Sequence, residues 1–285
     1  ASTPCPAPTV PANVLSIAGT DPTGGAGIQA DLKTFGALGA YGMAVVTAVV
    51  AQSTQAVRVV SPLTPELVQA QLEAVFEDVT VAAVKIGMVA NAGIAEAIAE
   101  VLARHRPPFV VFDPVMAAST HKRLMNESDL ERIRTMLLPQ VSLLTPNLKE
   151  AARLLGIAQP VDEAGMRACL PALQALGVPN VLLKGGHLAD DTPDAPESTD
   201  LLATPEGVIR LSAPRIATRH GHGTGCTLSS AIAALWPQHG LEKATRMAKD
   251  YVHGALLHAD ALQVGHGRGP LHHFWQAVHL PGQLA

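Results

Sequence analysis

Short apolar runs alternate along the chain with longer stretches in which apolar residues recur at helical spacing. In the stretch 28–38, for example, Ile28, Leu32, Phe35 and Leu38 lie three or four positions apart. Unbroken apolar runs predict strands buried on both faces, and the longer period predicts amphipathic helices. The pattern predicts strands at 14–18, 41–51, 81–88, 109–112, 142–145 and 181–183, and helices at 28–38, 65–79, 91–105, 148–155 and 162–176.

The last third of the chain departs from this alternation. Residues 201–203 and 208–211, joined through Pro205-Glu206-Gly207, predict a hairpin, and helices are expected at 227–236 and 241–262. Strands alternating with helices are typical of a parallel sheet. We therefore expect one α/β domain over 14–275, with a mostly parallel central sheet, helices on both faces and an antiparallel edge hairpin. A flexible, proline-rich tail is expected at 1–13 and a second tail at 276–285.

Composition narrows the range of partners. The formal net charge is −4 and no Lys/Arg run occurs, which argues against a nucleic-acid or acidic-membrane partner. Cys5, Cys169 and Cys226 fit neither a disulfide framework nor a zinc site, and this favours a reducing cytoplasm. No apolar run approaches the roughly 20 residues needed to span a bilayer. Residues 1–13 have no signal-peptide pattern. The expected partner is a small molecule.

A glycine-rich segment, His222-Gly223-Thr224-Gly225-Cys226, precedes the predicted helix 227–236. Glycines before a helix leave several backbone N–H groups free, and the helix dipole adds positive potential, so this segment predicts an anion hole. A cysteine in this field has a lowered thiol pKa and supplies a base. The structural alternative is a tight turn with a cysteine buried as a small apolar residue.

A second glycine loop lies at 20–27, directly after the first predicted strand. It is not a Walker A motif because no Gly-Lys-Ser/Thr follows. The pattern G-x-G-x-x-A is present at 25–30, but a dinucleotide site also needs an acidic residue roughly 20 positions on, and the next strand delivers Gln52 instead. The loop therefore predicts close approach of a ligand to the backbone rather than NAD binding.

Polar residues gather where the predicted strands end. In open α/β sheets these ends share one crevice, where ligands bind. Carboxylates at Asp113 and Glu150 suit Mg²⁺, and Lys184 with the anion hole suits phosphate. Together they indicate phosphoryl transfer to a hydroxyl group. Each residue also has a structural reading as a turn cap or a solvated charge. The full set is Asp21, Gln52, Asp113, Asn147, Glu150, Lys184 and the segment 222–226.

Five motifs carry a family resemblance. The segments 18–35, Asp113-Pro-Val-Met116, Thr145-Pro-Asn-Leu-Lys-Glu150, Lys184-Gly-Gly-His187 and 222–228, with the tail 264–274, resemble the bacterial hydroxymethylpyrimidine/phosphomethylpyrimidine kinases of thiamine biosynthesis. The resemblance implies a ribokinase-like three-layer sandwich. It also implies a homodimeric kinase that uses ATP and Mg²⁺ twice, first on a hydroxymethylpyrimidine and then on its monophosphate.

The resemblance also assigns roles to residues. Cys226 matches the base, and Gly223, Thr224 and Gly225 match the anion hole. The position of the pyrimidine-binding amide is Gln52, whose donor and acceptor suit an aminopyrimidine. The remaining matches are Gly19, Ala26, Asp31, Met88 and Val115 in the substrate pocket, Lys184, Asn147 and Thr224 at ATP, and Asp113 and Glu150 at Mg²⁺.

Two positions depart from the family pattern, and three other functions stay open. Gly221 stands where the family has threonine, and the loop 117–123 has its lysine displaced. A pyridoxal or pyridoxine kinase is the nearest alternative, because the same scaffold and anion hole serve a pyridine alcohol. A cysteine hydrolase with His222 as base, and a vitamin-binding module without turnover, belong to other classes.

Overall fold

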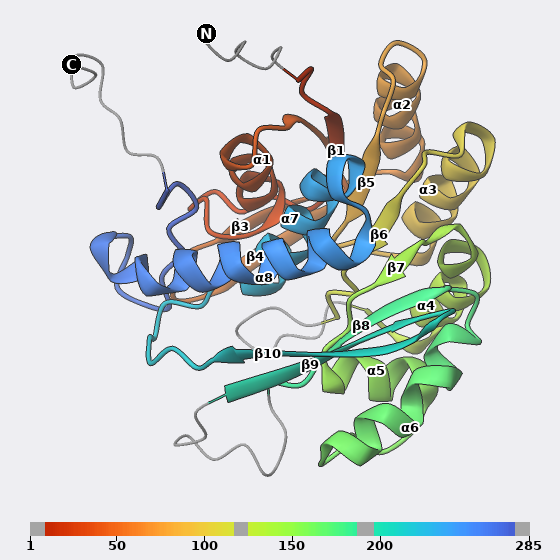
Figure 1. The fold of residues 1–285 in the computed structure, drawn as a ribbon. Coiled ribbons are helices and arrows are strands. Elements are labelled where there is room, and N and C mark those ends of the chain that lie inside the picture. Colours follow the sequence, from red (N-terminus) through yellow and green to blue (C-terminus); the bar gives the residue numbers. More distant parts are fainter. Residues whose placement is uncertain (1–8, 117–124, 187–196, 277–285) are drawn as a thin grey trace, which may run out of the picture.

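The computed structural model describes residues 9–116, 125–186 and 197–276 of the 285-residue chain (Figure 1). Within these ranges an eight-stranded sheet forms the centre of the molecule. Its strands are β1 (Asn13–Ala18), β2 (Tyr41–Val46), β5 (Ala83–Ile86), β6 (Val110–Phe112), β7 (Leu143–Leu144), β8 (Asn180–Lys184), β9 (Glu197–Thr204) and β10 (Gly207–Pro214). A separate two-stranded sheet contains β3 (Ala48–Gln52) and β4 (Val57–Pro62).

The sheet order is β10-β9-β8-β7-β6-β5-β1-β2. Every pair from β2 to β8 is parallel, whereas β8–β9 and β9–β10 are antiparallel. The predicted mostly parallel sheet with an antiparallel edge hairpin is confirmed. Because parallel strands end at the same edge of a sheet, the loops after β1, β5, β6, β7 and β8 are brought together there.

Helices cover both faces of the sheet, which gives three layers (Figure 1). Apolar side chains alternate along β1, so that Leu15 and Ile17 enter one core and Val14 enters the other. The first core packs against α2, α3, α5 and α6, and the second against α1, α7 and α8. The helices are α1 (Gly27–Ala37), α2 (Pro65–Phe76), α3 (Ala92–His105), α4 (Glu127–Arg132), α5 (Leu148–Leu155), α6 (Glu163–Gln174), α7 (Thr224–His239) and α8 (Leu241–Leu257).

The prediction of one strand over 41–51 is wrong. The run divides at Thr47 into β2, which pairs with β1, and β3, which forms a hairpin with β4. Thr47 is fully buried, and its Oγ1 donates a hydrogen bond of 2.6 Å to the carbonyl of Met88. This contact fixes the point at which the chain leaves the main sheet. Gln52 consequently lies at the end of β3, in the small sheet, and not at the end of a central strand.

Several other boundaries differ from the pattern. Helix α7 begins at Thr224 rather than at 227, because Gly223 adopts a left-handed conformation (φ 84°) and allows the first turn to start there. Helix α8 ends at Leu257, and a 3₁₀ turn follows at Ala259–Ala261. Strand β4, helix α4 and the π-helical turn Ile133–Leu137 were not expected.

Some predictions fall outside the described residues. These are the altered loop 117–123, His187 at the end of its motif, and most of the two tails, because 1–8, 117–124, 187–196 and 277–285 are not described. In the described ranges no helix combines the length and hydropathy required for a membrane span.

Candidate active site

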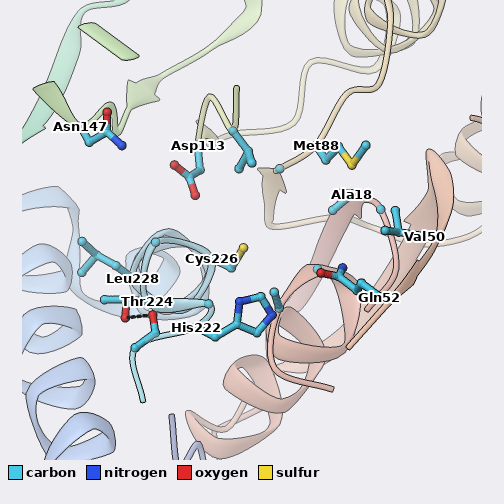
Figure 2. Close-up of a pocket in the computed structure, with 18 of the residues that line it drawn as sticks. Ala18, Val50, Gln52, Met88, Asp113, Asn147, His222, Thr224, Cys226 and Leu228 are labelled. Carbon is cyan, nitrogen blue, oxygen red and sulfur yellow. Dashed lines mark hydrogen bonds between the residues drawn. The ribbon is translucent and has the colours of Figure 1, made fainter. Parts of the chain in front are cut away.

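A cavity of about 380 Å³ opens at the carboxyl ends of the parallel strands, beside the N-terminus of α7 (Figure 2). The loop after β1, the β3–β4 hairpin, the ends of β5, β6 and β8, and the start of α5 all contribute to its wall. Every site residue expected from the sequence lines this cavity except Asp21 and Asp31. Those residues are Gly19, Ala26, Gln52, Met88, Asp113, Val115, Asn147, Glu150, Lys184, Gly223, Thr224, Gly225 and Cys226.

The N-terminus of α7 faces the cavity with its first turn. A Cβ atom at Gly223 would collide with the carbonyl oxygen of Gly25, so only glycine allows this contact between the two glycine loops. Thr224 Oγ1 donates a hydrogen bond of 2.7 Å to the carbonyl of Gly221 (Figure 2). In the described part of the chain, the amides of Gly225 and Cys226 have no backbone acceptor. With the positive end of the helix dipole, these free amides suit a bound anion, and they stay the candidate anion hole.

Asp21 organises the glycine loop between β1 and α1. Its fully buried carboxylate accepts hydrogen bonds from the amides of Gly25 (3.1 Å) and Ala26 (2.8 Å), and it contacts His222 Nε2 at 3.0 Å. Burial alone would raise the pKa of Asp21, but the hydrogen bonds from His222 and Thr23 lower it overall. Asp21 therefore joins the two glycine loops and is not free to act on a ligand.

Cys226 lies in the first turn of α7 and its sulfur points into the cavity (Figure 2). Burial raises the pKa of this thiol, and although the Lys85 ammonium opposes the shift, the net direction is upward. The expected lowering of the thiol pKa by the helix field is therefore wrong for the ligand-free protein. Desolvation of the thiolate, with the carboxylates of Asp31 and Asp113 nearby, outweighs the favourable field.

Asp31 lies behind the cavity wall rather than in it. Both of its oxygens contact Lys85 Nζ at 2.8 Å, and Ser16 and Ser230 each donate a hydrogen bond of 2.6 Å to it. Asp31 and Lys85 are fully buried. Burial alone would lower the pKa of Lys85, but Asp31 raises it overall, so the ammonium stays charged. In this structure Asp31 holds Lys85, and it is Lys85 that lines the cavity.

Asn147 and Glu150 form a capping box at the start of α5. The Asn147 side chain accepts from the Glu150 amide at 2.8 Å, and Glu150 Oε1 accepts from the Asn147 amide at 2.9 Å. This reciprocal pair explains the Asn-x-x-Glu spacing by local structure alone. It also orients the Glu150 carboxyl group toward the cavity.

Asp113, Glu150 and Lys184 form a charged cluster on one side of the cavity. Lys184 Nζ lies 3.5 Å from Asp113 Oδ1. Burial raises the pKa of Glu150 to about 7, Lys184 opposes this shift, and Asp113 reinforces it. Two carboxylates thus face one ammonium group in a partly buried position. No group of three or more His, Cys, Asp or Glu side chains suited to a metal occurs in the ranges described. Mg²⁺ commonly binds through only one or two carboxylates and keeps several waters, so this pair suits it.

Gln52 forms the opposite end of the cavity with apolar neighbours. Its Nε2 donates a hydrogen bond of 3.2 Å to the carbonyl of Thr20. Among the described residues Oε1 has no hydrogen-bond partner, so the amide presents an acceptor and a second N–H. Val50, two residues earlier on β3, and Met88 are the apolar side chains near it in the cavity wall (Figure 2). The arrangement suits a flat heteroaromatic ring with a polar edge.

Sequence reasoning missed two basic residues of the cavity, Lys85 and Arg268. Lys85 is the lone charge in the apolar strand β5, and a charge in a fully buried strand indicates a paired partner. Arg268 lies in a glycine-rich segment far along the chain, and no local pattern places it at the site.

The chain is similar to known kinases in sequence and in structure. Residues 21–272 match the family model described as phosphomethylpyrimidine kinase. The hydroxymethylpyrimidine/phosphomethylpyrimidine kinase of Salmonella typhimurium is 53% identical over 263 residues, which cover 92% of this chain and 97% of that protein.

Solved structures agree with this assignment. The phosphomethylpyrimidine kinase of Clostridium difficile has 38% identity and a TM-score of 0.74, covering 86% of this chain and 99% of that one. The pyridoxal kinase of Staphylococcus aureus, in complex with ADP, has 30% identity and a TM-score of 0.84, covering 95% and 96%. Both share the ribokinase-like fold. The chain is a kinase that belongs to the phosphomethylpyrimidine kinase family.

Proposed function

We propose that this protein transfers the terminal phosphoryl group of ATP to the hydroxyl of 4-amino-5-hydroxymethyl-2-methylpyrimidine, and then to the resulting monophosphate, in thiamine biosynthesis. The observation that carries the proposal is a single cavity with three different chemistries. It has a heteroaromatic end at Gln52, an anion hole that carries Cys226, and a charged cluster around Lys184. Phosphoryl transfer requires a positioned acceptor, stabilisation of the transferring group and neutralisation of the phosphate charge, and these three parts supply them.

Cys226 is the proposed general base. Its sulfur lies at the anion hole, where the acceptor oxygen meets the transferring group, and it takes the proton that the hydroxyl loses. Because its pKa is raised in the ligand-free protein, the thiolate is scarce at neutral pH. The rate should therefore rise with pH. The Lys85 ammonium, held by Asp31, stabilises the thiolate once it forms.

The charged cluster would hold the nucleotide and its metal. Asp113 and Glu150 would bind Mg²⁺, which neutralises the phosphate charge, while Lys184 and Asn147 would hold phosphate oxygens. Burial alone would lower the pKa of Lys184, but nearby carboxylates, Asp113 foremost, raise it overall, so its charge persists. A relative of this fold bound to ADP supports nucleotide use.

Pyridoxal kinase is the second candidate, because the structural match to the Staphylococcus aureus pyridoxal kinase has the higher TM-score. Sequence favours the pyrimidine: identity to the Salmonella kinase is 53%, against 30% to that pyridoxal kinase. We also propose a cytoplasmic homodimer. The three cysteines, which fit neither a disulfide framework nor a zinc site, support a reducing cytoplasm. Light scattering tests the dimer.

ADP release with ATP and Mg²⁺ tests the proposal. The substrates offered are the hydroxymethylpyrimidine, its monophosphate, pyridoxal, and none. Release with both pyrimidines and not without substrate supports the proposed function. Release with pyridoxal alone would transfer the assignment to the second candidate, and release with neither pyrimidine would overturn the proposal.

A further inference from the structure

Arg268 lines the cavity but has no role in the site as described so far, and it comes from the C-terminal segment 265–270. The stretch 265–270 crosses between the β3–β4 hairpin and the loop before α7. The amides of Gly267 and Arg268 donate to Thr54 Oγ1 (3.1 Å) and Thr54 O (3.0 Å). At its other end, the amide of Gly269 donates to His220 Nδ1 at 3.0 Å. The segment is therefore fixed at both ends, with Arg268 between them.

The Arg268 guanidinium lies against Gly221, at the entrance to the anion hole. Its Nη2 donates a hydrogen bond of 3.2 Å to the carbonyl of Gly221, the same oxygen that accepts from Thr224. A Cβ atom on Gly221 would lie 2.8 Å from Nη2. Gly221, which stands where the family pattern has threonine, therefore leaves the space that the guanidinium occupies.

Among the residues that the structure describes, most N–H groups of this guanidinium have no partner. Within the described ranges Arg268 makes no ion pair, and its side chain is exposed to the cavity mouth. The two lysines of the cavity are already committed, Lys85 to Asp31 and Lys184 to Asp113. Among the described residues of the cavity, Arg268 is therefore the basic side chain that is still available to bind an anion.

The position of Arg268 distinguishes the two substrates of the proposed reaction. Its backbone is bound to Thr54, two residues after Gln52, so it belongs to the pyrimidine side of the cavity and not to the Lys184 side. The first substrate carries an uncharged hydroxymethyl group on that side, whereas the second carries a phosphate. Arginine suits phosphate because its planar fork donates two parallel hydrogen bonds.

We propose that Arg268, given room by Gly221, binds the phosphate of the phosphorylated pyrimidine and so favours the second phosphorylation over the first. This inference rests on the proposed function. Replacing Arg268 by methionine should lower the ratio of kcat/KM for the monophosphate to kcat/KM for the alcohol by roughly 10- to 100-fold, the range of a charge-assisted hydrogen bond. The change should appear mainly in the KM of the monophosphate.

Arg268→Lys keeps the charge without the fork and should recover part of the ratio. Gly221→Thr should displace the guanidinium and lower the ratio in the same direction. In the Arg268→Met background, however, it should have little further effect, because the group that it displaces is gone. Arg246→Met, on the exposed face of α8 where Arg246 pairs with Glu242, is the matched control and should leave the ratio unchanged.

Steady-state kinetics of the wild type and these variants with both pyrimidines decide the question. The inference is supported if Arg268→Met and Gly221→Thr each lower the ratio of kcat/KM for the monophosphate to kcat/KM for the alcohol, and the double variant lowers it no further than Arg268→Met alone. If the wild type phosphorylates both pyrimidines but Arg268→Met changes both KM values equally or neither, the inference is overturned while the proposed function stands. If the wild type acts on neither pyrimidine, the proposed function fails, and the inference with it.

Discussion

Replacing Glu150 by glutamine should stabilise the ligand-free protein at alkaline pH. The structure raises the pKa of Glu150 from 4.5 to about 7, chiefly by burial and also through the nearby Asp113 carboxylate. At about 1.4 kcal/mol per pKa unit, the ionised form is disfavoured in the native state by roughly 3 kcal/mol. Glutamine removes that charge and still accepts the Asn147 amide in the capping box.

The sign of the effect depends on pH. Below pH 4.5 Glu150 is protonated in both the folded and the unfolded protein, so the substitution should change little. Between pH 4.5 and 7 the folded protein binds the extra proton, so the stability of the wild type relative to the variant falls as the pH rises. Above pH 7 the free energy of unfolding of the variant should exceed that of the wild type by roughly 3 kcal/mol, which corresponds to roughly 5 °C in melting temperature.

Denaturant unfolding of both proteins from pH 4 to 8.5, with EDTA and no nucleotide, measures this difference. Glu163→Gln is a matched control, because Glu163 is only half-buried and its hydrogen bond with Arg210 lowers its pKa. That variant should gain no stability at pH 8. A Glu150→Gln difference that does not vary with pH, or that favours the wild type at pH 8, would refute the reasoning. The stabilised variant should also lose Mg²⁺-dependent activity, since it lacks a proposed metal ligand.

Three further predictions follow from the packing of the site. Gly223→Ala should abolish activity or folding because its Cβ meets the facing glycine loop. Gly156→Ala, which is also left-handed (φ 67°, ψ 36°) but has open space around its Cβ, should cost only about 1–2 kcal/mol, and equal losses would contradict the collision. Asp31→Asn leaves the Lys85 ammonium buried without its counter-charge and should destabilise the protein by about 3–5 kcal/mol in denaturant unfolding, and a loss below about 1 kcal/mol would disprove this role. The rate of the wild type should rise with pH through the alkaline range as Cys226 ionises, and an unchanged profile in Cys226→Ala would exclude the thiolate as base.

The fold was largely predictable because each central strand is buried on both faces. Strands such as β1 and β5 then appear as unbroken apolar runs, and the helices between them keep their own period. The division of 41–51 was not predictable in this way. The turn at Thr47 depends on a hydrogen bond to Met88, which lies 41 residues further on, and β3 is as rich in apolar residues as β2.

The site was predictable where function and local structure require the same residues. The glycines before α7 and the capping box of α5 have short-range signals. Asp31 was misplaced, because its partner Lys85 is 54 residues away and its burial is a tertiary property. The predicted direction of the pKa shift of Cys226 was wrong for a similar reason. The helix dipole is evident from the sequence, whereas desolvation of the thiol by the surrounding side chains is not.

The central claim is that the cavity phosphorylates one pyrimidine twice with Cys226 as the base. Phosphorus NMR of the reaction with ATP, Mg²⁺ and the hydroxymethylpyrimidine tests it directly, because the monophosphate and diphosphate products have separate signals. The wild type should form the monophosphate first and the diphosphate after it, and Cys226→Ala should form neither at a comparable rate. A wild type that forms no phosphorylated pyrimidine, or a Cys226→Ala variant with undiminished rates, would contradict the account.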